Sequence, residues 1–161
     1  MRLMRTAAVA AFLGVSCAPS DKLGIADRAQ IVQAVSAGLE VWGRAVSNRE
    51  LDTLAQLYIR TADLPAVWMD GARTRGWKDA SAERKRWSDS LSQLNFVIED
   101  ANIDVLDRQV ALATFRTTID AIAGRARARS HGRGTQVWMR DPGDQRWKIR
   151  AEHESILFED R

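Results

Sequence analysis

Apolar residues recur at three- and four-residue steps in the first part of the chain, which is the period of an amphipathic helix. This spacing predicts a helix over residues 26–46 with one buried stripe. The positions on that stripe are Ile31, Val35, Leu39, Trp42 and Val46. Ser47 and Glu50 then have the spacing of a capping box, which predicts that a second helix begins at this point.

The pattern changes after Pro65, because proline cannot continue a helix. A short strand is expected over residues 66–70, followed by a turn at Asp70-Gly71 and a third helix over residues 78–91. Four further strands are predicted at residues 95–106, 110–122, 135–140 and 147–158. Helices followed by consecutive strands predict an α+β domain, in which three N-terminal helices cover one face of an antiparallel sheet.

The N-terminal stretch differs from the rest of the chain. Arg2 and Arg5 precede an apolar run over residues 7–15, and small residues surround Cys17. This order is typical of a secretory signal peptide, here residues 1–17. The run is shorter than the roughly 20 apolar residues that cross a bilayer. We expect residues 18–25 to form a tether and residues 26–161 to form the domain.

The sequence Gly14-Val15-Ser16-Cys17 also resembles a bacterial lipoprotein signal, although Gly14 stands where such signals usually have a leucine-like residue. Three alternatives remain open: lipidation of Cys17, plain secretion, and a short uncleaved anchor. The expected location is the periplasm or, for a lipoprotein, the membrane surface. Contact with the membrane is expected only through a lipid on Cys17.

Charge and cysteine content exclude several classes of protein. The sequence has a pI near 9.5, but Arg2 and Arg5 belong to the signal, so that 22 of the 24 basic residues remain against 21 acidic ones. The mature domain is nearly neutral, and we expect no nucleic-acid partner. Cys17 is the only cysteine, which excludes an internal disulfide framework. His131 and His153 lack the spacing of metal ligands, and the sequence indicates no metal site and no cofactor.

The C-terminal strand alternates between an apolar and a charged set of positions. One set holds Trp147, Ile149, Ala151, His153, Ser155 and Leu157, and the other holds Lys148, Arg150, Glu152 and Glu154. Because buried charges are costly, we expect the charged set to be solvated and His153 and Ser155 to face the helices. His153 would then be a hydrogen-bonded structural group, a ligand-binding group or a general acid and base.

Three segments carry a resemblance to a known family. They are VWGRAVSNRELDTLAQLY, VWMDGARTRGWKDASAERKRW and GRGTQVWMRDPGDQRWKIRAEHESILF. Together with the order of helices and strands, they resemble the SnoaL-like branch of the nuclear transport factor 2-like superfamily over residues 27–158. In one common variant of that branch a second histidine precedes the last one by two residues. Ala151 stands there, which argues against a role that needs a histidine pair.

The resemblance implies a cone, in which a strongly curved sheet wraps around the helices and a cavity opens at the wide end. It also implies frequent dimerisation through the sheet. Members of the superfamily include isomerases, cyclases, dehydratases, ligand carriers and non-catalytic association domains. Membership therefore does not determine the activity.

An apolar cavity with few polar groups is the usual form of a small-molecule site. The expected ligand-binding residues are Trp42, Tyr58, Trp68, Trp87, Arg133 and Ser155. His153 is the expected catalytic residue, and Asp70, near the rim of the cavity, is the expected second one. Core packing would equally explain the tryptophans, and turn chemistry would explain Asp70.

Two further features concern partners. The arginine-rich segment over residues 124–134 is expected to be a loop, with three alternatives: a solvated hairpin end, a site for an anionic headgroup or acidic ligand, or a nucleic-acid site, although it lacks aromatic residues for base stacking. Trp138 has polar parity partners, so that we expect it on the outer face of the sheet. A second subunit that covers it would give a homodimer.

The leading hypothesis is an exported domain that binds a small, largely apolar molecule in its cone. The first alternative is an isomerase, cyclase or dehydratase that uses His153 as acid and base, with Asp70 or Tyr58 assisting. The second is a non-catalytic association module. The sequence does not indicate which small molecule would bind.

Overall fold

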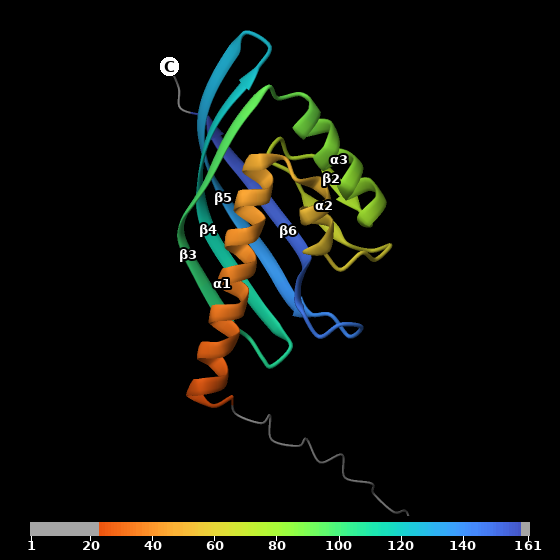
Figure 1. Ribbon diagram of the computed structural model, residues 1–161, viewed down its shortest axis with the longest axis vertical. Coiled ribbons are helices and arrows are strands. Elements are labelled where there is room, and N and C mark those ends of the chain that lie inside the picture. Colours follow the sequence, from red (N-terminus) through yellow and green to blue (C-terminus); the bar gives the residue numbers. More distant parts are fainter. Residues whose placement is uncertain (1–22, 159–161) are drawn as a thin grey trace, which may run out of the picture.

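The computed structural model describes residues 23–158, which form three helices and six strands (Figure 1). The helices are α1 (Ile25–Asn48), α2 (Leu51–Gln56) and α3 (Trp77–Asp89). The strands are β1 (Pro65–Val67), β2 (Arg73–Arg75), β3 (Gln93–Val105), β4 (Val110–Ala123), β5 (Ala126–Arg140) and β6 (Trp147–Phe158). The expected signal peptide, Cys17 and residues 18–22 of the expected tether lie outside the described residues. Within residues 23–158, no helix has both the length and the apolar character needed to cross a membrane.

One curved sheet contains all six strands in the order β2-β1-β6-β5-β4-β3. Neighbouring strands run antiparallel except β1 and β6, which are parallel. Helix α1 lies along the concave face, and α2 and α3 lie beside it on the same face (Figure 1). The α+β prediction, with three helices on one side of a curved sheet, is therefore confirmed.

The connection between α1 and α2 differs from the predicted capping box. Helix α1 continues to Asn48, and the Ser47 Oγ accepts a hydrogen bond from the Phe96 backbone N–H at 2.9 Å. Glu50 stands at the N-cap of α2 but makes no capping bond with its side chain. Ser47 therefore satisfies a donor on the edge strand β3 rather than the end of a helix, a tertiary contact that local spacing cannot indicate.

The segment expected to be an arginine-rich loop is mostly strand. Residues from Ala126 onward pair with β4, and the turn is confined to Gly124 and Arg125, with Gly124 at φ 60°. The inward positions of this part of β5 carry small side chains, which gave no apolar signal in the sequence. Small side chains are needed there because the neighbouring strand is close: a Cβ on Gly132 would lie 2.5 Å from the Ser155 carbonyl oxygen.

A β-bulge in β6 inverts the predicted orientation of its C-terminal half. Val137 pairs with Ala151 while the next residue, Trp138, pairs with Ile149, so that Arg150 is an extra residue in β6. One inserted residue reverses the alternation of faces beyond it.

The prediction that His153 faces the helices is consequently wrong, because its side chain is exposed. The Ser155 hydroxyl likewise points away from the helices and lies 3.5 Å from the Arg133 carbonyl oxygen. Glu152 and Glu154, which we expected in solvent, are buried instead, with relative exposures of 4% and 3%.

The orientation of β5 is also opposite to the prediction. Trp138 is 0% exposed and packs on α1, where a Cβ on Gly38 would lie 2.8 Å from its ring. Arg133, which we expected in the cavity, is exposed on the outer face. Gly38 makes the room that Trp138 needs, a complementarity between distant residues. The argument for a dimer built on an exposed Trp138 is therefore overturned.

Candidate functional site

The concave face of the sheet carries a buried cluster of three charged side chains. Arg84 comes from α3, and Glu152 and Glu154 come from the bulge-shifted half of β6. The Arg84 Nη2 lies 3.1 Å from Glu152 Oε1 and 2.8 Å from Glu154 Oε1. The side chains of the three residues are 8%, 0% and 3% exposed, respectively. Such a cluster is stable only when its members satisfy one another, because each ion has lost its hydration.

Tyr58 and Trp42 extend this cluster by a chain of hydrogen bonds. The Trp42 indole N–H donates to the Tyr58 hydroxyl at 2.9 Å, and that hydroxyl donates to Glu152 Oε2 at 2.7 Å. Both oxygens of Glu152 are thereby occupied, one by Tyr58 and one by Arg84. Glu152 is therefore a structural member of the cluster rather than a group available to a ligand.

Burial is the main cause of the altered pKa values in the cluster. It raises the pKa of Glu152 and, helped by the Glu152 charge, raises the pKa of the Tyr58 hydroxyl well above its ordinary value. Burial alone would lower the pKa of Arg84, but the charges of Glu154 and Glu152 outweigh it. Tyr58 thus remains a neutral donor and Arg84 remains a cation.

Two tryptophans hold the Arg84 guanidinium in place. Its Cζ lies 4.6 Å from the centre of the Trp68 ring and 5.5 Å from that of Trp42. Cation–π contacts of this kind are strongest away from water. They restrict the side-chain rotation of Arg84 and so fix the position of the carboxylates that it binds.

A cavity of about 550 Å³ lies between α3 and the part of the sheet formed by β4, β5 and β6. Its wall is mainly apolar, and Trp68, Trp87, Ile119 and Ile156 are among the residues that line it. Charged side chains also line the cavity. Arg84 and Glu154 of the buried cluster are among them, together with Glu83 and Arg86 on α3 and Asp70 in the turn between β1 and β2. The volume and the lining are typical of a site for a small molecule.

Glu154 connects the cluster to this cavity. Its Oε1 accepts a hydrogen bond from Arg84, whereas its Oε2 is buried without a hydrogen-bond partner among the described residues. Glu154 also lines the cavity. A buried carboxylate oxygen without a donor is costly, so a donor supplied from the cavity would stabilise it.

The structure brings together five of the eight predicted site residues. Trp42, Tyr58 and Trp68 belong to the buried cluster. Trp87 and Asp70 line the cavity, and the Asp70 Oδ1 accepts a hydrogen bond from the Ala72 N–H at 2.9 Å as expected for a turn. The other three, Arg133, His153 and Ser155, lie on the opposite side of the sheet.

Sequence reasoning missed Arg84, Glu152 and Glu154. One signal for Arg84 was present, because it lies four residues after Ala80 and three before Trp87, which places it on the same face of α3 as these two apolar residues. The two glutamates had no comparable signal, because the alternation that would have placed them was inverted by the bulge.

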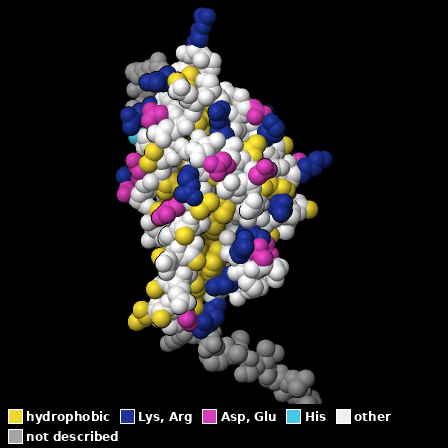
Figure 2. Space-filling model, viewed as in Figure 1, with side chains coloured by type: hydrophobic (Ala, Val, Ile, Leu, Met, Phe, Trp, Pro, Cys, Tyr) yellow, Lys and Arg dark blue, Asp and Glu magenta, His cyan; other side chains and the backbone are white. Residues whose placement is uncertain are grey.

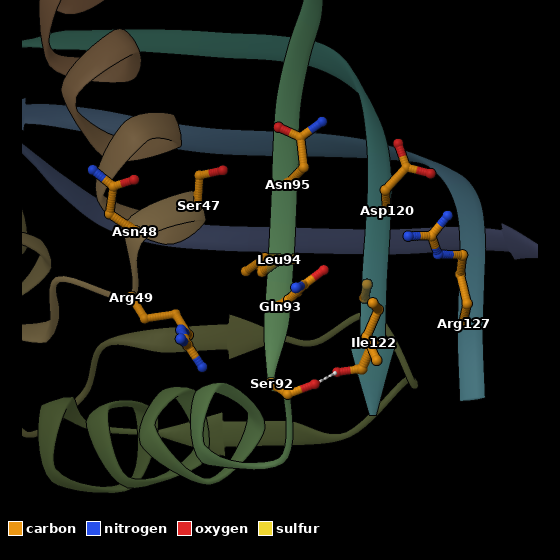
Figure 3. A pocket seen from close by; sticks show the side chains of 11 residues that line it. Ser47, Asn48, Arg49, Ser92, Gln93, Leu94, Asn95, Asp120, Ile122 and Arg127 are labelled. Atoms are coloured by element: carbon orange, nitrogen blue, oxygen red, sulfur yellow. Dashed lines mark hydrogen bonds between the residues drawn. The ribbon is translucent and has the colours of Figure 1, made fainter. Parts of the chain in front are cut away.

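A second hollow, of about 660 Å³, lies at the β3 edge of the sheet, where α1 ends beside β3 (Figure 3). Its lining is polar, but much of it is already used in structural contacts. Ser47 binds the backbone of β3, the Ser92 hydroxyl donates to the Ile122 carbonyl at 3.1 Å, and the Arg49 guanidinium donates to the Leu91 carbonyl. The cavity beside Glu154 is therefore the better candidate for a ligand site.

Metal chemistry finds no support in the described part of the chain. Within residues 23–158, no group of three or more histidine, cysteine, aspartate or glutamate side chains is arranged to hold a metal ion.

Solved structures of low sequence identity share this fold. A candidate dehydratase of the nuclear transport factor 2-like family from Streptomyces avermitilis aligns with a TM-score of 0.73 and 18% identity, over 82% of this chain and 99% of that one. A candidate scytalone dehydratase from Novosphingobium aromaticivorans aligns with a TM-score of 0.72 and 10% identity, over 84% and 93% of the two chains. A nuclear transport factor 2-like protein from Salmonella enterica gives a TM-score of 0.72 and 17% identity, over 83% and 94%.

No curated protein sequence matches the chain. The model of the SnoaL-like domain family matches residues 35–159, which are most of the 161 residues of this chain. The chain therefore belongs to the SnoaL-like domain family, and it shares the fold of nuclear transport factor 2-like proteins.

Proposed function

We propose that the protein binds a small, largely apolar molecule in the cavity between α3 and the sheet, and that Glu154 accepts a hydrogen bond from it. The observation that carries this proposal is the Glu154 Oε2, which is buried at the cavity without a partner among the described residues. The apolar wall would take the body of the ligand, and Glu154 would select one that carries a hydroxyl or another donor.

Arg84 acts as a positioning residue in this proposal. It binds Glu154 Oε1 and leaves Oε2 directed elsewhere. Glu152 and Tyr58 fix Arg84 and its partners from behind. The cluster contains one cation and two carboxylates, so that it favours an additional donor over an additional acceptor.

Binding of two matched probes tests the proposal. 2-Naphthol has an O–H donor, and 2-methoxynaphthalene has the same ring system without one. In a fluorescence titration we expect the protein to bind 2-naphthol about tenfold more tightly or better, because a hydrogen bond to a charged group contributes about 1.5–3 kcal/mol. Equal affinity for the two probes, or no binding of either, would contradict the proposal.

Glu154→Gln should abolish this preference, since the amide can turn its donor toward the cavity. Glu83→Gln is the matched control, because Glu83 lines the same cavity but is bonded to Arg86. We expect the control to keep the preference for 2-naphthol. A loss of equal size in both variants would show that charge at the rim, not the free oxygen of Glu154, determines the selection.

Proton transfer is the second candidate function, favoured by a carboxylate that lines an apolar cavity and has one oxygen without a hydrogen-bond partner among the described residues, and by the two structural neighbours described as candidate dehydratases. Glu154 would be the general base, in place of His153, whose side chain is exposed. A base of this kind would exchange an acidic C–H of a bound ketone with solvent deuterium. Nuclear magnetic resonance of 2-tetralone in D₂O would detect exchange that Glu154→Gln abolishes.

Export is proposed from the sequence of residues 1–17. We expect the mature protein to reach the periplasm or to remain on the membrane through a lipid on Cys17. Mass spectrometry of the protein from the cell envelope would distinguish the two forms. A mature protein that still starts at Met1 and carries no lipid would contradict both.

A homodimer through the outer face of the sheet remains a proposal, now on different residues. Leu112, Val137 and Ala151 are neighbours in one row across β4, β5 and β6, on the outward face. They are only partly exposed, and together they form a small apolar patch. Val137→Glu should give a monomer in sedimentation velocity. A wild-type protein that is already monomeric would refute the dimer.

A further inference from the structure

The outer face of β5 carries a row of arginines, which we name the arginine stripe: Arg127, Arg129 and Arg133, with Arg125 in the preceding turn. Arg127, Arg129 and Arg133 alternate with inward residues, so that these three side chains share one exposed side of the hairpin, and Arg125 is exposed in the turn. With a rise of about 3.3 Å per residue, the part on the strand covers roughly 20 Å. The stripe lies on the β4–β5 hairpin, whose tip projects beyond α3 (Figure 1).

The stripe reaches the tip of the β4–β5 hairpin. Figure 2 shows a basic side chain at the tip where Figure 1 draws this hairpin. The mature domain as a whole is nearly neutral, with 22 basic and 21 acidic residues after Cys17. The stripe is therefore a local concentration of positive charge and not a consequence of overall composition.

The arrangement places positive charges next to one another, and acidic residues pair with only some of them. Arg133 is the direct cross-strand partner of Arg116 on β4, and like charges in this position destabilise a sheet. Arg116 forms an ion pair with Asp100, and Arg129 lies 3.8 Å from Asp120. Within residues 23–158, the structure shows no acidic partner for Arg125, Arg127 or Arg133.

We propose that the arginine stripe binds the anionic headgroups of a lipid membrane. The stripe follows one side of a regular strand and presents its charges side by side, which fits a flat array of anions. Each basic residue near an anionic membrane contributes about 1 kcal/mol, so the stripe alone gives weak, reversible binding. A single lipid chain is also a marginal anchor, and a basic patch is the second signal that makes such an anchor stable.

Two other partners fit the stripe less well. Single-stranded nucleic acid is bound through aromatic side chains as well as charge, and the cross-strand neighbours of the stripe on β4 are Arg116, Asp120 and Ile122. A second copy of this chain, docked stripe to stripe, would bring two positively charged surfaces together. A dimer through Leu112, Val137 and Ala151 would not involve the stripe. Both partners are outcomes of the test below.

Vesicle binding of the full chain tests the proposal. The variant Arg127→Gln/Arg129→Gln/Arg133→Gln removes three charges from the stripe, and Arg44→Gln/Arg73→Gln/Arg75→Gln removes three exposed arginines elsewhere. Partitioning is measured by co-sedimentation with phosphatidylcholine vesicles and with vesicles that contain about one third phosphatidylglycerol. Because every variant keeps residues 1–22, the N-terminal segment contributes equally, and the ratio of the two partition coefficients isolates the effect of charge.

We expect the wild type and the control triple to prefer phosphatidylglycerol vesicles at least about tenfold, and the stripe triple to lose most of this preference. The preference should disappear in 0.5 M salt and survive Arg→Lys replacement at the same three positions, because it depends on charge alone. Equal losses in both triples would overturn the proposal. So would displacement from vesicles by millimolar glycerol phosphate, which would indicate a small-anion site, or tighter binding to single-stranded DNA than to vesicles.

The melting temperatures of the glutamine and lysine variants, compared with that of the wild type, would show whether the variants are folded. The stripe residues are exposed and lie outside the cavity, so ligand binding at Glu154 should be unchanged in the stripe triple. The outcome is therefore independent of the proposed function.

Discussion

The protein contains two clusters of the same composition, each with one cation between two carboxylates, in very different surroundings. In the buried cluster, Arg84 binds Glu152 and Glu154, whose side chains are 0% and 3% exposed. At the start of β6, the Lys148 Nζ lies 2.6 Å from the Asp141 Oδ2 and 2.7 Å from the Asp144 Oδ2 in the preceding turn, and the three side chains are 16%, 20% and 42% exposed, respectively. The comparison separates the effect of burial on carboxylate pKa values and stability from the effect of pairing with a cation.

The pKa of Glu152 in the buried cluster moves in the opposite direction to the pKa values of Asp141 and Asp144. Burial raises the pKa of Glu152 despite its bond to Arg84. Hydrogen bonds from Lys148 lower the pKa of both Asp141 and Asp144, because little desolvation opposes them. The cluster near the surface is thus satisfied by its own members, whereas the buried one leaves the Glu154 Oε2 without a donor among the described residues.

The largest expected effect is that of removing the buried cation. Arg84→Met should lower the free energy of unfolding by about 3–5 kcal/mol, because it leaves two carboxylates buried without a counter-ion. Urea denaturation measures this change. Lys148→Met, the same replacement in the exposed cluster, should give a much smaller loss, and equal losses would refute the contrast between the clusters.

Neutralising the whole buried cluster sharpens that test. Arg84→Met/Glu152→Gln/Glu154→Gln should recover most of the stability lost in Arg84→Met, since no charge remains buried. If the triple variant were no more stable than Arg84→Met, loss of packing against Trp68 and Trp42 would explain the single variant instead.

Tyr58→Phe should have the next largest effect, a loss of about 1–3 kcal/mol, because Glu152 loses a donor and the Trp42 indole N–H loses its acceptor. Thermal and urea unfolding measure it. The double variant Trp42→Phe/Tyr58→Phe also removes the indole that Tyr58→Phe leaves without an acceptor. We therefore expect Tyr58→Phe to lower the free energy of unfolding less in the Trp42→Phe background than in the wild type. Simple additivity would contradict a shared hydrogen-bond chain.

The two clusters should also respond to pH with opposite signs. Glu152 has a raised pKa in the folded protein, so its contribution to stability is present below its ordinary value of 4.5 and is lost as pH rises through the folded pKa. Glu152→Gln should therefore become more stable relative to the wild type as pH rises, with a slope of at most about 1.4 kcal/mol per pH unit.

The aspartates of the exposed cluster have lowered pKa values, so their contribution is present above their ordinary value of 3.8 and is lost as pH falls through the folded pKa. Asp141→Asn/Asp144→Asn should therefore be less stable than the wild type at neutral pH and approach it in acid. Unfolding free energies between pH 3 and pH 8 measure both series. Parallel trends in the two variants would contradict the comparison.

The smallest effect is expected at His153. Because its side chain is exposed on the outer face, His153→Ala should change the free energy of unfolding by no more than about 0.5 kcal/mol and leave probe binding unchanged. A loss of 2-naphthol binding in this variant, with Glu154→Gln unaffected, would place the site on the opposite face of the sheet.

The sequence determined the secondary structure of this protein to a large extent. The helical stripe from Ile31 to Val46 and the long strands have regular periods, and these periods follow from local geometry alone. Trp42, Trp68 and Tyr58 were also recognised as inward residues, because large aromatic side chains at such spacing favour the core, whereas Trp138 was expected on the outer face and is buried.

The tertiary structure decided which residues of β5 and β6 face the cavity. Alternation fixes only that neighbours point in opposite directions, and a single inserted residue exchanges the two faces. That residue is Arg150, and it becomes an insertion only when β6 pairs with β5 in this register. Pairing between residues distant in sequence therefore exposed His153, buried Glu154, and brought it to Arg84, 70 residues earlier in the chain.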